Sequence, residues 1–355
     1  MSANQDQQKL RVTLEDLSEI GSQTANIVST GSVAYGESPG VRSYGNVNSM
    51  PEAPALTQEK GSIFLQGWCY LGLAGLAGAL IAWAIAEPGF MDGGDHHWGN
   101  IWMLPLLVTL MCIGFAVAES IVERSTRKVL IRGGLALPLG IVLGFIFNGI
   151  ANIFFAILLG ICYQLGVVSI HNPAAWVARG LAWMVFGAAG GVVYGIIGQS
   201  MKRTGYGVLG GAVGAAVGGM IFDPISFATH GGATSRAVGF GLLGLATGVA
   251  MGLVESALKD RWLYVTAGPL AGKQFILYKP QTAMGSSQSC DIYLFKDAEI
   301  LPQHAVLRLK GSRVHLVATG PAYVSGQPVR GTRVLETGAV IQLGRYGFRY
   351  QERQR

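Results

Sequence analysis

The residues that could bind a metal are gathered in one short loop. Asp92, Asp95, His96 and His97 occur within the stretch DGGDHH. Carboxylates and imidazoles are common ligands of divalent metals. A polar loop between two helices explains the same residues equally well, so we predict no metal site and no cofactor.

Three ionisable residues lie near the ends of long apolar segments, namely Glu119, Glu255 and Arg132. An ionisable side chain inside a membrane is a functional candidate by default. Close to the cytoplasmic end of a helix, however, it can reach water or pair with neighbouring arginines and lysines. We favour this second interpretation.

Patterns that would indicate catalysis are not found. The glycine-rich stretches 187–191 and 211–219 are not followed by the GK[ST] of a phosphate-binding loop. No Ser-His-Asp, HExxH or paired-carboxylate arrangement stands in a plausible site. We therefore predict no catalytic residues and a protein that is not an enzyme.

The composition indicates a membrane protein with charged ends. Half of the 355 residues are hydrophobic and 13% are charged, against about a quarter charged in soluble domains. Residues 62–261 hold 10 basic and 8 acidic residues, residues 1–61 hold 4 and 7, and residues 262–355 hold 12 and 5. A basic C-terminal domain can rest near anionic lipid or meet an acidic partner, but a soluble charged surface is the simpler interpretation.

Neither the first 60 residues nor the cysteines predict a defined structural feature beyond one short helix. Residues 1–60 are polar, without the pattern of a cleaved signal peptide, and we expect them to be largely disordered apart from a short helix over 13–27. The four cysteines show no CxxC pair, so we predict neither a disulfide framework nor a zinc site.

Residues 61–258 are expected to form a multi-pass helical membrane domain. Residues 63–86 and 101–118 are each long enough to span a bilayer. The basic turn at 124–132 follows the second span, and positive charge accumulates on the cytoplasmic side. This places that turn and the N-terminus inside and the acidic loop 87–98 outside.

Small residues stripe the segment from Ile196 to Asp223, which we predict to be a hairpin of two packed helices around a basic turn. In lipid, small residues four apart allow close approach of helix backbones. One stripe contains Gly207, Gly211, Ala215 and Gly219, and a second contains Gly210, Gly214 and Gly218.

An internal repeat supports the topology. A shift of 75 residues matches Ser125 with Ser200 and Gly144 with Gly219, and chance similarity between glycine-rich helices is the alternative. Residues 150–168 are the difficulty. They form either a re-entrant or interfacial helix, which gives six crossings, or a further crossing, which gives seven; we favour six.

From Trp262 the pattern changes to short strand-like runs separated by Gly, Pro, Ser and Asp, which predicts an all-β sandwich over 262–352. The runs are WLYVTA, KQFILY, DIYLF, AVLRLK, RVHLVA, AVIQLG and FRYQ. About 94 residues are enough for one small core.

This C-terminal segment closely resembles a forkhead-associated (FHA) domain of the kind found in bacterial polytopic membrane proteins. The resemblance covers residues 262–350 and depends on several motifs together. They are Gly285, the strand with Asp291, Ile292 and Leu294, the pair His304–Ala305, and the ending Leu335, Gly338, Ile341, Leu343 and Gly344.

The resemblance implies loops that read phosphothreonine in a partner peptide, and it places the peptide-binding positions at Gly285, Ser286, Ser287, Leu301, Gln303, Ser325 and Gly326. The family has an arginine where this chain has Ser286, a serine at Leu301 and an asparagine at Ser325. Each lost charged hydrogen bond is worth about 1.5–3 kcal/mol, so we expect the phosphate pocket to be degenerate. His304 is expected to support the loops rather than to contact ligand.

We therefore expect a protein of the bacterial cytoplasmic membrane whose N-terminus and FHA-like domain are cytoplasmic. Its partners would be a protein or phosphoprotein and membrane lipids, with no nucleic acid. The alternatives are a small-solute channel or transporter that the FHA-like domain regulates, and a scaffold clustered as a homo-oligomer by its glycine stripes.

Overall fold

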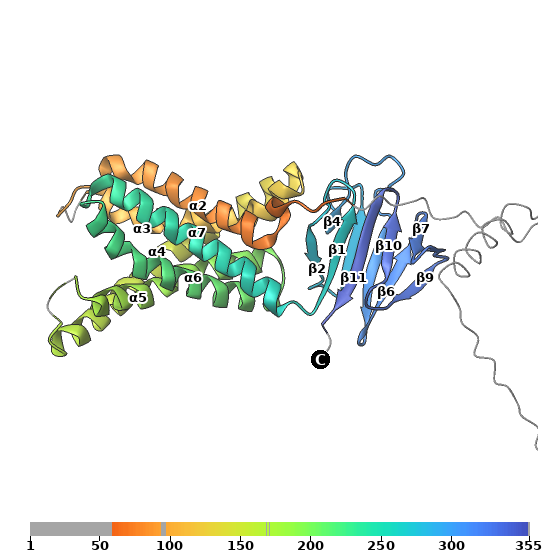
Figure 1. Ribbon diagram of the computed structural model, residues 1–355. Helices are drawn as coiled ribbons and strands as arrows, with labels where there is room; N and C mark the ends of the chain where they lie inside the picture. Colours follow the sequence, from red (N-terminus) through yellow and green to blue (C-terminus); the bar gives the residue numbers. More distant parts are fainter. Residues whose placement is uncertain (1–58, 94–96, 168, 170, 354–355) are drawn as a thin grey trace, which may run out of the picture. The chain divides into compact units, whose positions relative to one another are not determined.

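The structure is a computed structural model that describes residues 59–353 except 94–96, 168 and 170. The predicted disorder of residues 1–60 and the helix over 13–27 thus fall almost entirely outside the described residues. Residues 51–355 belong to one compact unit. Within it, long helices come first and short strands follow (Figure 1).

Six helices form the first part, and all six are long and apolar enough to cross a membrane. Their buried side chains form one continuous apolar core, which includes Leu71, Phe115, Phe186 and Leu243. The helices are α2 (Gly67–Ala86), α3 (Trp98–Val122), α4 (Thr126–Gln164), α5 (Pro173–Ile197), α6 (Met201–Ala228) and α7 (Gly232–Leu258).

The two small-residue stripes of α6 face two different helices. A Cβ atom added to Gly211 would lie 2.2 Å from the carbonyl oxygen of Gly187 on α5. One added to Gly214 would lie 2.4 Å from the carbonyl oxygen of Ala246 on α7. Contacts this short leave no room for a side chain, so α6 packs backbone to backbone on both neighbours.

The other two glycines expected to pack follow the same division. Gly207 lies against Gly191 of α5, and Gly218 lies against Leu243 of α7. The glycine packing extends beyond the predicted hairpin, because Gly244 of α7 in turn meets Gly75 of α2, with an added Cβ 2.2 Å from the Gly75 carbonyl oxygen.

Residues 150–164 form no helix of their own, which corrects the expectation of a separate re-entrant or interfacial helix, or of a separate crossing, in this stretch. The described residues contain six helices of membrane-spanning length, the number favoured from the sequence. Residues 150–164 continue α4, which runs unbroken from Thr126 to Gln164. Asn148 and Gly149 interrupt the apolar pattern, but the Asn152 side chain donates to the Asn148 backbone carbonyl oxygen at 2.9 Å and the helix persists. At 39 residues and 1.5 Å per residue, α4 is about 58 Å long.

The 75-residue repeat has a matching local geometry at its start. Ser125 caps α4 and Ser200 caps α6, each through a side-chain oxygen that accepts from the backbone amide three residues later. The residues just before them, Arg124 and Gln199, both have positive φ, at 53° and 54°. The two helix starts are therefore built in the same way.

The second part is a sandwich of two sheets packed on a shared apolar core. One sheet has the order β2-β1-β11-β10-β7-β8 and the other the order β4-β3-β5-β6-β9. All pairings are antiparallel except β3 with β4. The strands are β1 (Arg261–Ala267), β2 (Gln274–Ile276), β3 (Gln281–Gly285), β4 (Ile292–Tyr293), β5 (Ala305–Lys310), β6 (Arg313–Ala318), β7 (Ala322–Val324), β8 (Gln327–Pro328), β9 (Thr332–Leu335), β10 (Val340–Leu343) and β11 (Tyr346–Glu352).

The predicted fold class, a helical membrane domain followed by an all-β sandwich, is confirmed. Each of the seven strand-like runs contains a strand. Four strands had not been singled out by their composition alone: β3, β7, β8 and β9. They are two to five residues long. Length alone does not explain why they were missed, because β2 and β4 are equally short and lie within longer apolar runs.

Candidate functional site

The predicted recognition positions begin at the end of β3. Gly285 is buried there, and a Cβ on it would lie 2.2 Å from the Pro302 carbonyl oxygen. The backbone amides of Ser286 and Ser287 donate to the carbonyl oxygens of Leu301 and Pro302, at 3.0 and 3.2 Å. The β3–β4 and β4–β5 loops are therefore joined side by side.

His304 joins the β4–β5 loop to the loop at 319–321, between β6 and β7. Its side chain is buried, its Nδ1 accepts from the Leu301 amide at 3.1 Å, and its Nε2 donates to the Pro321 carbonyl oxygen at 2.8 Å. The Gly320 amide donates to the His304 carbonyl oxygen at 3.1 Å. Both ring nitrogens are thus used inside the protein, which leaves His304 in a positioning role.

The loop at 319–321 was not anticipated, although it lies directly against His304. A Cβ on Gly320 would come within 2.6 Å of the His304 ring, so only glycine fits there without displacing the imidazole. The signal was present in the sequence as the Gly-Pro pair between two strand-like runs. Ser325 and Gly326, in contrast, form the β7–β8 turn, where both have positive φ.

At the predicted recognition positions these loops carry uncharged side chains, both polar and apolar, and no cation. Leu301, Gln303 and Ser325 are exposed, and Ser286 and Ser287 are partly exposed. A phosphate group carries nearly two negative charges and binds best to arginine or to clustered donors. At the predicted positions the loops therefore offer a phosphate group no cationic side chain.

Cys290 closes the base of the β3–β4 loop. Its thiol is buried and donates to the Pro302 carbonyl oxygen at 3.1 Å. Burial raises the pKa of the Cys290 thiol above its ordinary value, against the opposing charge of Lys128. A thiol kept protonated is a poor nucleophile, so Cys290 has a packing role.

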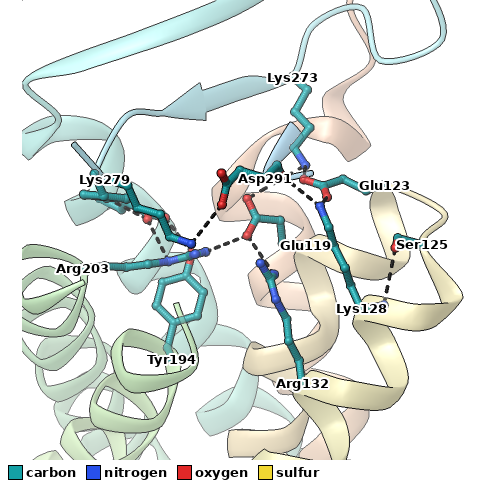
Figure 2. A network of polar contacts seen from close by, with 12 residues as sticks. Glu119, Glu123, Ser125, Lys128, Arg132, Tyr194, Arg203, Lys273, Lys279 and Asp291 are labelled. Atoms are coloured by element: carbon teal, nitrogen blue, oxygen red, sulfur yellow. Dashed lines mark hydrogen bonds and ion pairs between the residues drawn. The ribbon is translucent and has the colours of Figure 1, made fainter. Parts of the chain in front are cut away.

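A second cluster of polar residues lies where the helix ends meet the sandwich (Figure 2). Arg203 of α6 is at its centre, stacked over Tyr194 of α5 with 4.0 Å between guanidinium carbon and ring centroid. An Arg203 terminal nitrogen donates to Glu119 of α3 at 3.0 Å and to the Tyr194 hydroxyl at 2.6 Å. Arg132 of α4 donates to the same Glu119 oxygen at 3.1 Å.

Glu255 of α7 completes this helix-end cluster. Its carboxylate accepts from the hydroxyls of Tyr194 and Tyr278, at 2.9 and 2.8 Å. Arg203 Nε lies 3.5 Å from Glu255, which is an ion-pair distance, but it makes no hydrogen bond within the described residues. Burial, reinforced by the charge of Glu255, raises the pKa of Tyr278 above its ordinary value, so this phenol stays protonated as a donor.

Lys273 of the sandwich enters the same cluster. Its side chain is 0% exposed, its Nζ donates to Glu123 at 2.6 Å, and it lies 4.0 Å from Glu119. Lys128 of α4 donates to the other Glu123 oxygen at 2.9 Å and to the Asp291 carbonyl oxygen at 2.8 Å. The charges predicted to reach water or pair locally are thus paired across helices and with the sandwich.

Sequence reasoning found Glu119, Glu255 and Arg132 but missed Arg203 and Lys273. Glu119 and Glu255 occupy similar stretches, AESIVER and VESALKD, and the structure brings both to Arg203. Lys273 begins the strand-like run KQFILY, and nothing in that run distinguishes it from a surface lysine. Only the tertiary contact buries it.

The acidic loop before α3 carries a different arrangement. Arg236 of α7 donates to Glu87 at 2.6 and 3.0 Å and to Asp92 at 2.9 Å, and it lies over the Phe90 ring. Asp95 and His96 lie outside the described residues. In the described part of the chain no three His, Cys, Asp or Glu residues group closely enough to hold a metal ion.

Comparisons with known proteins match the residues of the sandwich. Residues 264–354 match the family model described as "Inner membrane component of T3SS, cytoplasmic domain". The chain is 36% identical over 87 residues to an oxoglutarate dehydrogenase inhibitor of Corynebacterium efficiens, which covers 24% of this chain and 60% of that protein. It is 36% identical over 87 residues to the glycogen accumulation regulator GarA of Mycolicibacterium smegmatis, covering 24% and 54%.

Among solved structures, the FHA domain of the CT664 protein from Chlamydia trachomatis is 25% identical. The matched region covers 27% of this chain and all of the Chlamydia chain, with a TM-score of 0.25. The chain thus spans little more than half the length of the curated relatives, and these similarities concern its last quarter.

The family match, the two-sheet topology and the set of motifs around Gly285 and His304 all fall on the same residues. The six long apolar helices precede them in the same chain. The chain thus joins six helices that are long and apolar enough to cross a membrane to a C-terminal β-sandwich that resembles forkhead-associated domains.

Proposed function

We propose that the protein is a membrane-anchored interaction protein whose FHA domain recruits a protein partner without requiring phosphothreonine. One observation carries this proposal. The two loops that bear Ser286 and Leu301 are joined by backbone hydrogen bonds, and His304 ties the second of them to the loop at 319–321. Ser286, Leu301 and, in the separate β7–β8 turn, Ser325 nevertheless supply no cation. Loops held in place without a cation at these positions support recognition of a partner that does not depend on phosphate.

The charge distribution supports a cytoplasmic position for this domain. The first turns of α4 and α6, the residue before α4's cap and the residue after α7 carry basic side chains: Arg127, Lys128 and Lys202, Arg124, and Lys259. The opposite connection, between α2 and α3, is acidic. Because positive charge is in excess on cytoplasmic loops, this distribution supports a cytoplasmic N-terminus and a cytoplasmic FHA-like domain.

The proposal is tested with the full chain in detergent and a fluorescent peptide library containing paired threonine and phosphothreonine peptides. We expect no micromolar binding that depends on the phosphate. The variant S286R/L301S restores two of the family's contacts and should gain such binding if the loops are otherwise intact. Micromolar, phosphate-dependent binding by the unaltered chain would overturn the proposal.

Recruitment itself is tested by site-specific photocrosslinking in cells. A crosslinker in place of Gln303 should trap a partner whose yield is unchanged by phosphatase treatment, whereas one at Lys310, exposed on β5 away from these loops, should not. Equal trapping at both positions would argue against recognition by the loops. Solute flux into liposomes by the full chain would favour the alternative of a channel or transporter.

A further inference from the structure

A cavity of about 360 Å³ opens between the cluster of paired charges and the FHA domain. Its walls come from the start of α4, the end of α5 and the β2–β4 edge of the sandwich. A volume of this size is in the range of small-molecule sites. The β3–β4 loop contributes Gln288, Ser289 and Cys290 to its wall, but none of the predicted recognition positions lines it.

The lining of this cavity is strongly cationic. Five of its side chains are basic and two are acidic: Arg127, Lys128, Arg132, Arg203 and Lys279 against Glu119 and Asp291. Most of these cations already have a carboxylate partner. Arg127 is the exception, because its exposed guanidinium has no ion pair within the described part of the chain. The cavity therefore offers unsatisfied positive charge to an anion.

One wall changes from charged to apolar along a single helix face. Arg127, Ile131 and Leu135 follow one another at four-residue spacing on α4 and all line the cavity. Ile131 and Leu135 are 51% and 58% exposed, although both are large and apolar. At 1.5 Å per residue, Leu135 lies about 12 Å further along the helix than Arg127.

The sandwich supplies polar groups on the opposite side. Lys279 bonds to Asp291 at 2.9 Å and to the Gln199 side chain at 3.2 Å, and Ser289 is exposed beside it in the cavity wall. A ligand there would meet cations and hydroxyls at one end and the apolar face of α4 at the other. Only an amphiphile with an anionic head matches both ends.

We propose that this cavity binds the phosphate-bearing headgroup of an anionic phospholipid, with one acyl chain along Ile131 and Leu135. Basic pockets between membrane helices on the cytoplasmic side are a known mode of recognition of acidic lipids. The inference rests on the membrane position of the helices and goes beyond partner recruitment. A negative result with peptides would leave it standing.

The test uses the full chain in detergent micelles and native mass spectrometry with added phosphatidylglycerol or phosphatidylcholine. Each cation near an anionic membrane surface is worth about 1 kcal/mol, so R127Q should weaken phosphatidylglycerol binding about five-fold. K279Q should act in the same direction. R333Q removes the same charge from exposed β9, outside the cavity, and should have no effect.

Arg127 suits this test because its side chain is exposed and unpaired, and each variant is checked for an unchanged melting temperature. A preference for phosphatidylglycerol that R127Q weakens and R333Q spares supports the proposal. Equal losses in R127Q and R333Q would show a diffuse charge effect and overturn it. Displacement of the lipid by millimolar inorganic phosphate would show a soluble anion as the ligand and overturn the lipid assignment.

Discussion

At the scale of single residues, the FHA-like domain has a buried histidine that holds its loops, while the positions at which the resemblance places phosphate contacts carry no cation. His304 bonds to backbone on two loops and is 1% exposed. Ser286 stands where the family has arginine. A buried polar network tolerates little change because every member depends on the others, whereas an exposed ligand contact can be lost without harm to the fold.

Replacing His304 by alanine should loosen the loops at 301–303 and 319–321. The substitution leaves the Leu301 amide and the Pro321 carbonyl without partners, which costs about 1–3 kcal/mol. Hydrogen exchange of the full chain should show faster exchange in both loops. H315A, on the partly exposed β6 position, is the matched control, and equal protection of the loops in H304A and the unaltered chain would contradict the assigned role.

At the scale of elements, the packing of the helices depends on glycines as much as on large apolar side chains. α6 carries two glycine stripes, and each stripe brings its backbone into contact with a different neighbouring helix. Apolar side chains such as Leu209, Val213 and Val217 are exposed on the remaining face of α6. In lipid, exposure of these side chains has no hydrophobic cost, and packing at the stripes is what holds the helices together.

A substitution at a stripe position should therefore be far more damaging than one beside it. G211V places a branched side chain where a Cβ would already be 2.2 Å from the Gly187 carbonyl oxygen, and such overpacking costs about 1–3 kcal/mol. The melting temperature in detergent should fall. G205V lies on the same helix with nothing within 4 Å of its added Cβ, so a similar fall in both variants would show that glycine packing is not the cause.

At the scale of the whole molecule, buried charges join the helix ends to the FHA domain. Lys273 directly precedes β2 in the sandwich, and the helical part contributes Glu119, Glu123 and Glu255. Removing one partner of a buried ion pair leaves an uncompensated charge, which is far more costly than the pair itself is worth.

The arrangement of the chain across the membrane gives a direct prediction. With six crossings, a cysteine at position 92 should react with an impermeant maleimide added from outside, and one at position 202 should react only after permeabilisation. Both native side chains are well exposed, at 77% and 63%, so access is not limited by burial. Labelling of position 202 in intact cells would rule out this topology.

The sequence by itself determined the division into apolar helices and a β-sandwich, because both signals are local. Apolar runs of span length and short runs bounded by glycine and proline depend only on neighbouring residues. The motif positions around Gly285 and His304 were equally readable. The extent of α4 was not, since Asn148 and Gly149 look like an interruption although the helix continues through them.

The tertiary structure decided how charges far apart in the chain are paired. Arg203 contacts Glu119, 84 residues away, and Lys273 contacts Glu123, 150 residues away. No local pattern encodes such a pair, because the residues next to a lysine in the sequence do not reveal whether its side chain will be buried or exposed. The cavity beside Arg127 likewise exists only where α4, α5 and the sandwich meet, since its shape and charge belong to no single segment.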